Sequence, residues 1–158
     1  MKSLVVFYSR SGVTQTVGAA VAEALEGDVE ELLDARKRTG LLGFLRSGNE
    51  ARNKKLTELQ PTRLEPSDYD LVIIGTPIWA SDISSPVRTY LTHHQNAFKH
   101  VAFFYTRGGT SDINAFKEMQ LLCGKAPRAA LALTQKEVKN GAYREKVRQF
   151  VEQLQLNP

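Results

Sequence analysis

Short apolar runs that alternate with helix-like segments constrain the fold of this 158-residue chain more than any other feature. Residues 71–74 and 101–105 are continuously apolar, which is typical of strands buried on both faces of a parallel sheet. Three further runs, each bounded by turn residues, cover 4–8, 29–33 and 129–133. Five such runs separated by helical segments predict an open α/β sheet.

The segments between these runs have apolar residues at helical spacing. Helical patterns cover 14–25, begin again at Pro86, and cover 114–122 and 143–154. Right-handed crossovers would place these helices on both faces of the sheet. The segment 38–61 is longer than an ordinary connection, and its leucines and glycines predict a mostly helical excursion with a flexible start. We therefore expect residues 1–158 to form a single domain.

The turn after the first apolar run has the residue types of a phosphate-binding loop. It contains, in order, Ser9, Arg10, Ser11, Gly12, Val13 and Thr14. Backbone N–H groups and the positive end of the following helix would converge on one anion, and the hydroxyls could donate to phosphate oxygens. Because no lysine follows the glycine, the turn differs from the loop that binds nucleoside triphosphates. It suits a terminal monophosphate better.

Two further unusual segments are expected as loops after the third and fourth strands. They contain Thr76, Pro77, Ile78 and Trp79, and then Thr106, Arg107, Gly108 and Gly109. Trp79 could stack on a planar ring or anchor its own loop, and the paired glycines could admit a ligand or form a tight turn. Ligands of open α/β sheets bind at the carboxyl ends of the strands. Three unusual segments at that edge favour a ligand site.

The charge of the chain is unevenly distributed. The net charge is +4, and the segment from Arg36 to Lys55 contains seven basic residues and one acidic residue. A basic segment can attract nucleic acid, anionic lipid or an acidic partner, but it can also be a solvated helical face. No nucleic-acid-binding motif accompanies the charge, so we expect no nucleic acid partner.

The remaining composition bears on the compartment and on metals. A single cysteine, Cys123, excludes an internal disulfide and favours a reducing, cytoplasmic setting. No apolar segment is long enough to span a membrane. The three histidines, His93, His94 and His100, do not have the spacing of a metal site. The sequence therefore predicts no metal, and it singles out no catalytic residue.

With these segments the chain resembles the flavodoxin family. The resemblance is carried by residues 7–14, 72–79 and 104–109, and it extends through 40–46 and essentially the whole chain. It implies a flavodoxin-like three-layer sandwich with a five-stranded parallel sheet in the order 2-1-3-4-5, which binds FMN non-covalently. By this resemblance, residues 9–14 would hold the FMN phosphate and residues 76–79 would border the isoalloxazine ring, with Trp79 as the stacking partner. Residues 106–109 would contact the polar edge of the ring through main-chain groups.

The chain departs from the electron-carrier members of the family in two respects. Those carriers are generally acidic and often have a second stacking tyrosine, whereas this chain is basic and has no aromatic residue at 110–113. One face of the ring could then be open to a substrate or partner. Arg10 and Arg107 would favour the anionic reduced flavin. One charge about 7 Å away, at an effective dielectric constant of about 20, is worth at most about 2 kcal/mol, on the order of 100 mV for one electron.

The sequence thus leads to an FMN-binding flavoprotein that transfers electrons to a redox partner protein or reduces a small acceptor such as a quinone. An NAD(P)H-dependent oxidoreductase of narrower substrate range is an alternative. A cofactor-free flavodoxin-like binding module is another, but Gly12, Trp79 and the Gly108–Gly109 pair speak against it.

Overall fold

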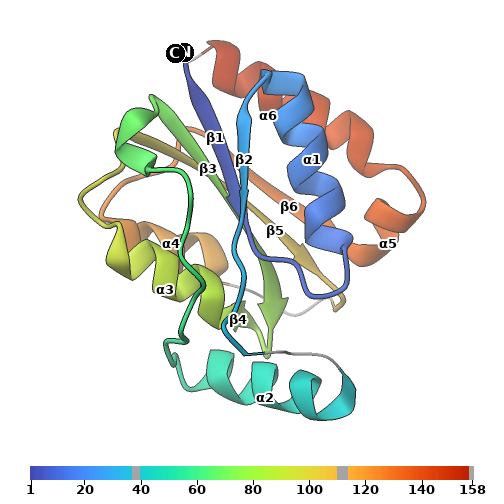
Figure 1. The fold of residues 1–158 in the computed structure, drawn as a ribbon. Helices are drawn as coiled ribbons and strands as arrows, with labels where there is room; N and C mark the ends of the chain where they lie inside the picture. Colours follow the sequence, from blue (N-terminus) through green and yellow to red (C-terminus); the bar gives the residue numbers. More distant parts are fainter. Residues whose placement is uncertain (37–39, 110–113, 157–158) are drawn as a thin grey trace.

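The elements of the chain alternate between strands and helices in a computed structural model that describes residues 1–36, 40–109 and 114–156 (Figure 1). The strands are β1 (Ser3–Phe7), β2 (Asp28–Glu31), β3 (Leu71–Trp79), β4 (Asp82–Ile83), β5 (His100–Arg107) and β6 (Ala130–Thr134). The helices are α1 (Val13–Leu25), α2 (Gly40–Arg52), the 3-10 turn η1 (Pro66–Asp68), α3 (Ser85–His93), α4 (Ala115–Cys123), α5 (Gln135–Lys139) and α6 (Tyr143–Leu156).

Five strands form a parallel sheet in the order β2-β1-β3-β5-β6. This is the expected order 2-1-3-4-5 of the long strands, and the flavodoxin-like sandwich is confirmed. The two-residue β4 is an addition, and it pairs antiparallel with the end of β3. At the centre of the sheet, Val5 is level with Ile73, and Ile73 is level with Ala102. The carboxyl ends of β1, β3 and β5 therefore lie at one edge.

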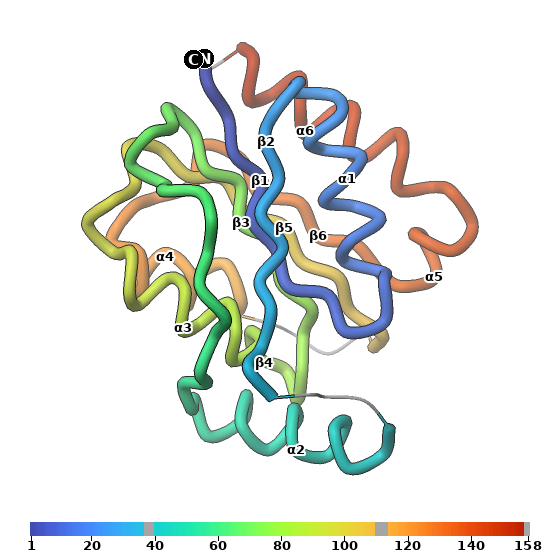
Figure 2. Tube along the Cα trace, viewed as in Figure 1, coloured from blue at the N-terminus to red at the C-terminus, as the bar shows by residue number. Residues whose placement is uncertain are grey.

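Helices cover both faces of this sheet (Figures 1 and 2). Alternate side chains of a strand point to opposite faces. Accordingly, Val5 and Phe7 pack in the cluster that includes residues of α1 and α6, whereas Leu4 and Val6 pack in the cluster that includes residues of α3 and α4. The helix α2 belongs to neither layer and lies across the carboxyl edge of the sheet (Figure 1).

The structure corrects the expected ends of several elements. Residues 76–79 and 106–107 were expected in loops, but they continue β3 and β5, and Pro77 is level with Thr106. Proline is tolerated at Pro77 because β1 has already ended at Phe7, which is level with Gly75, so no partner strand needs its N–H. The helical excursion is confirmed as α2, and its expected flexible start at 38–39 lies outside the described residues. The short α5 was not expected.

Close packing at the centre of the sheet requires a glycine in β3. An ideal Cβ built on Gly75 would lie 2.0 Å from Cζ of Phe104, so the aromatic ring occupies the space of the missing side chain. Phe104 is fully buried on β5, next to β3. The ring has no free volume into which it can move.

We expect the substitution Gly75→Ala to destabilise the protein by about 2 kcal/mol, because the new methyl group must displace the Phe104 ring. Urea unfolding of the cofactor-free protein measures this change. Gly109→Ala is the matched control, since no heavy atom lies within 4 Å of the added Cβ, and its change should stay below about 0.5 kcal/mol. Equal stability of the two variants would contradict the packing argument.

Candidate functional site

A cavity of about 360 Å³ opens at the carboxyl edge of the sheet, where the three unusual sequence segments meet. Eleven of the fourteen residues expected at the site line it: Arg10, Ser11, Val13, Thr14, Pro77, Ile78, Trp79, Thr106, Arg107, Gly108 and Gly109. Ser9, Gly12 and Thr76 are not among its lining residues. The cavity is also lined by six residues that were not expected at the site: Phe44, Ser47, Gly48, Ala80, Ser81 and Gln135.

The turn between β1 and α1 is shaped by Ser9 and Gly12. Gly12 has a φ of 90°, in the left-handed region that favours glycine, and its N–H donates to Oγ of Ser9 at 3.1 Å. Gly12 is the N-cap of α1 and provides no side-chain cap. The backbone N–H groups in the first turn of α1 are therefore not capped by a side chain of Gly12. Such groups can donate to an anion.

Two hydroxyl groups join this turn to the fourth long strand. The side-chain oxygens of Thr14 and Thr106 lie 2.8 Å apart, and both residues are buried. Thr14 was expected to face the phosphate with its hydroxyl, and in the structure this hydroxyl bridges α1 to β5. Thr16 donates to the carbonyl of Gly12 at 2.9 Å and lies outside the cavity lining. The turn between β1 and α1 is thus held in a fixed position relative to β5.

A tight hairpin forms the second wall of the cavity. Ala80 and Ser81, between β3 and β4, have φ values of 47° and 64°, which residues other than glycine seldom adopt. Thr76 lies behind this wall: it is fully buried and accepts from the backbone N–H of Ser84 at 3.1 Å. Thr76 therefore supports the hairpin. It was expected to border the ligand, but it is not among the residues that line the cavity.

Trp79 lies at the boundary between the cavity and the core. It lines the cavity, but only 9% of its surface is exposed, and its ring meets Tyr8 edge-on with centroids 5.4 Å apart. The side chain of Trp79 thus packs into the core, as a loop anchor would, and it also forms part of the cavity wall. Stacking on a flavin stays a prediction.

The third wall comes from α2, to which the sequence analysis assigned no role. Phe44, Ser47 and Gly48 line the cavity, and the guanidinium of Arg10 lies 5.3 Å from the centroid of the Phe44 ring. The expected position of a second stacking aromatic residue was 110–113, and this segment lies outside the described residues. The signal for Phe44 was present in 40–46, which belong to the resemblance, but a sequence cannot show that a distant helix returns to the site.

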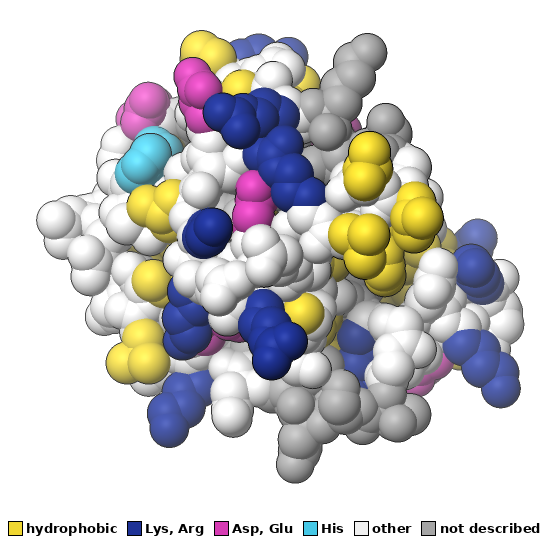
Figure 3. Space-filling model, turned by 90° about the horizontal axis from the view of Figure 1, so that it is seen from below, with side chains coloured by type: hydrophobic (Ala, Val, Ile, Leu, Met, Phe, Trp, Pro, Cys, Tyr) yellow, Lys and Arg dark blue, Asp and Glu magenta, His cyan; other side chains and the backbone are white. Residues whose placement is uncertain are grey.

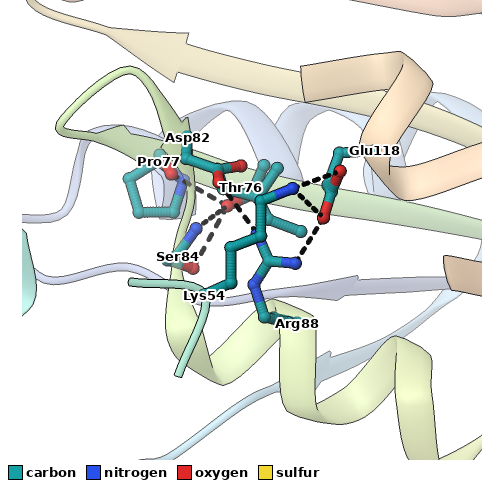
Figure 4. Close-up of polar contacts among 8 residues, drawn as sticks. Lys54, Thr76, Pro77, Asp82, Ser84, Arg88 and Glu118 are labelled. Atoms are coloured by element: carbon teal, nitrogen blue, oxygen red, sulfur yellow. Dashed lines mark hydrogen bonds and ion pairs between the residues drawn. The ribbon is translucent and has the colours of Figure 1, made fainter. Parts of the chain in front are cut away.

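A buried ion network ties the hairpin and the end of α2 to α3 and α4, which cover one face of the sheet (Figure 4). Arg88 of α3, with a side chain only 4% exposed, pairs with Asp82 of β4 at 3.0 Å and with Glu118 of α4 at 2.5 Å. Lys54, just after α2, also reaches Glu118 at 3.1 Å. Burial alone would raise the pKa of the Glu118 carboxyl, but its hydrogen bonds to Arg88 and Lys54 hold that pKa below its ordinary value.

The rim of the cavity near Gly108 is formed by Gln135, the first residue of α5. A capping box begins this helix: Thr134 accepts from the N–H of Glu137, and the carboxylate of Glu137 accepts from the N–H of Thr134 at 2.8 Å. The hydrogen bond with Lys146, together with those from Thr134, lowers the pKa of Glu137 to about 2. This pattern, Thr134 followed three residues later by Glu137, was the readable signal for α5.

Other candidate groups lie away from this cavity. Cys123 is buried, which raises the pKa of its thiol. Within residues 1–36, 40–109 and 114–156, no three His, Cys, Asp or Glu side chains are grouped so that they could hold a metal ion. In the same part of the chain, no helix has the length and apolar character needed to cross a bilayer.

The sequence matches the family described as flavodoxin over residues 2–154. The fold and this match, which covers nearly the whole chain, define the class of the protein. The chain belongs to the flavodoxin family. No sequence among curated proteins gives a significant match.

Solved structures share the fold. A protein from Bacteroides uniformis ATCC 8492, provisionally classed as a flavoprotein, is 29% identical with a TM-score of 0.77, over 96% of this chain and 97% of that one. A flavoprotein from Lactobacillus acidophilus NCFM, solved in complex with FMN, is 21% identical with a TM-score of 0.71, over 88% and 97% of the two chains. The flavodoxin of Megasphaera elsdenii is 12% identical with a TM-score of 0.60, over 94% and 97%.

We expect Arg88→Met to destabilise the protein by about 3 kcal/mol, because Asp82 and Glu118 lose a buried positive partner. Urea unfolding measures the loss. Arg148→Met removes an equally charged side chain that is 59% exposed and paired with Glu145, and it should cost less than about 1 kcal/mol. A difference of zero between the two variants would show that the network does not hold the hairpin.

The Arg88→Met variant and the unmodified protein should also differ in their response to acid. The folded-state pKa of Glu118 is lowered, so its contribution is present above its ordinary pKa and is lost as the pH falls through the lowered value. Without Arg88 the pKa of Glu118 rises towards its ordinary value. Unfolding of Arg88→Met should therefore depend less on pH in this acidic range than unfolding of the unmodified protein.

Proposed function

We propose that the protein binds FMN in the cavity at the carboxyl edge of the sheet and acts in electron transfer or in the reduction of a small acceptor such as a quinone. The observation that carries the proposal is the convergence of three distant segments on one cavity in a chain of the flavodoxin family. A relative of the same fold, from Lactobacillus acidophilus, was solved with FMN bound.

The chemistry of the walls fits the two ends of FMN. The turn at 9–14, with its glycine N-cap and the helix behind it, suits the phosphate. Pro77, Ile78 and Trp79 on one side and Phe44 on the other offer apolar and aromatic surface to the isoalloxazine ring. Thr106, Arg107, Gly108 and Gly109 offer polar groups for its pyrimidine edge. Bound FMN supplies the capacity to accept and donate one or two electrons.

The positive charge of the walls would tune that capacity. Arg10 and Arg107 both line the cavity, and either guanidinium would favour a negative charge that develops on the ring. A partly buried charge is screened less than an exposed one. We therefore propose a higher reduction potential than that of an acidic electron carrier.

The donor and the acceptor are open to a direct assay. Anaerobic reduction of the FMN-loaded protein with NADH or NADPH, followed by quinones, separates the alternatives. Rapid turnover supports an oxidoreductase, whereas slow one-electron exchange without turnover supports a carrier.

We expect FMN to bind the purified protein with quenching of its fluorescence, and riboflavin, which has no phosphate, to bind at least about tenfold more weakly. The reason is the phosphate turn at the start of α1. A fluorescence titration with each flavin measures both affinities. A protein that binds neither would overturn the flavoprotein assignment, and equal affinities would overturn the role of residues 9–14.

The substitution Arg107→Gln should lower the reduction potential of the bound flavin by up to about 100 mV for one electron, since a positive charge is removed from the cavity wall. Arg128→Gln is the matched control: Arg128 is also partly buried, but it precedes β6 at the opposite edge of the sheet. A dye-coupled redox titration reports both potentials. Equal shifts in the two variants would contradict a local effect.

A further inference from the structure

Helix α2 presents the reverse of an ordinary amphipathic pattern. Its buried residues are the small Gly43, Ser47 and Ala51, which recur every four positions and therefore share the face that meets the domain. On the other side, Leu41 is 74% exposed, Leu42 83% and Leu45 57%. In a surface helix the large apolar residues normally face the core. The outer face of α2 therefore offers apolar surface to a partner outside this chain.

This face is a contiguous feature and not a scatter of single residues. Leu41, Leu42 and Leu45 lie within the first two turns of one helix, and Phe44, 56% exposed, continues the apolar surface to the cavity. We call these four residues the α2 apolar face. Seen from below, hydrophobic side chains gather on this side of the molecule (Figure 3). Exposed apolar clusters with a polar rim mark sites of interaction.

The same segment is strongly basic. Between Arg36 and Lys55 the sequence has seven basic residues and one acidic residue. Arg52, seven positions after Leu45, shares its side of the helix, and both Arg52 and Lys55 are exposed. In the view from below, Lys and Arg side chains are more prominent than Asp and Glu (Figure 3). A partner that covers this face must accept leucines and also carry negative charge.

Charge decides between the occupants. Two copies of the chain that met through α2 about a two-fold axis would bring their basic segments together, and like charges would oppose the contact. An anionic bilayer accepts both features: leucines enter the boundary between headgroups and acyl chains, while lysines and arginines approach the negative surface. The leucines belong to α2, which lies outside both helix layers at one end of the molecule, where a flat bilayer can approach it (Figure 1).

We propose that α2 docks the protein on the surface of a membrane that contains anionic lipid. Leu41, Leu42 and Leu45 enter the headgroup boundary, and the exposed Arg52 and Lys55 bind lipid phosphates. Phe44 belongs both to this face and to the cavity wall, so docking places the cavity at the bilayer surface. Resting on the proposed function, this makes a lipid-soluble quinone in the membrane the acceptor class.

The test is flotation of the purified FMN-loaded protein with phosphatidylcholine vesicles that contain phosphatidylglycerol, and with vesicles of phosphatidylcholine alone. We expect binding to the anionic vesicles that weakens with added salt. L42Q/L45Q should lower the partition coefficient about tenfold or more. Arg52→Gln and Lys55→Gln should each lower it on the order of fivefold. Leu121→Gln, on a leucine 66% exposed on α4, is the matched control and should bind as the unmodified protein does.

Absence of binding to anionic vesicles, or equal loss in L42Q/L45Q and Leu121→Gln, would overturn the docking proposal. Two further results would overturn it by identifying another occupant. A lower mass of L42Q/L45Q than of the unmodified protein in sedimentation would indicate a second copy of the chain. Slower electron exchange of that variant with an acidic ferredoxin would indicate a protein partner. The cofactor-free protein is floated in parallel. If it binds vesicles but no flavin, docking stands and the proposed function fails, so the two failures are distinguishable.

Discussion

The parallel register of β1, β3 and β5 is the constraint on which the site depends. Because β1 ends at Phe7, level with Gly75, and β3 continues beside β5 to Pro77, three chain segments leave the sheet at one edge. This register requires a glycine at position 75, where the Phe104 ring fills the space of a side chain. It also brings Thr14 within 2.8 Å of Thr106, 92 positions later in the chain, so the phosphate turn is fixed to the opposite wall.

The open α/β sheet and the cavity edge could be predicted because continuous apolar runs and glycine-containing turns are local signals. The strand order 2-1-3-4-5 was implied by the resemblance to the flavodoxin family. The carboxyl end of β3 could not be predicted, because Gly75 and Pro77 are residue types that normally interrupt a strand. Here the register with β1 has ended, and pairing with β4 continues the strand. The contribution of α2 was also hidden from the sequence. Its place at the cavity depends on contacts such as that between Arg10 and Phe44, which no local pattern encodes.

The network around Arg88 explains how a strained hairpin and a helix outside both layers keep their positions. Two successive residues, Ala80 and Ser81, hold positive φ angles, which the tertiary structure must stabilise. Arg88 ties the residue that follows them, Asp82, to Glu118, and Lys54 ties the end of α2 to the same carboxylate. One buried cation thus couples two walls of the cavity. Such a network joins four elements, so sequence periodicity cannot reveal it.

The basic charge acquires two consistent roles at this edge of the molecule. Arg10 and Arg107 line the cavity, and in the proposed FMN site they would favour an anion, whether the phosphate or the reduced ring. Outside, the charges around α2 favour an anionic surface, and Phe44 joins the two regions. The acidic electron carriers of this family would be repelled by an anionic membrane surface. The basic charge and the exposed leucines beside the cavity therefore support the proposal of an acceptor in the membrane.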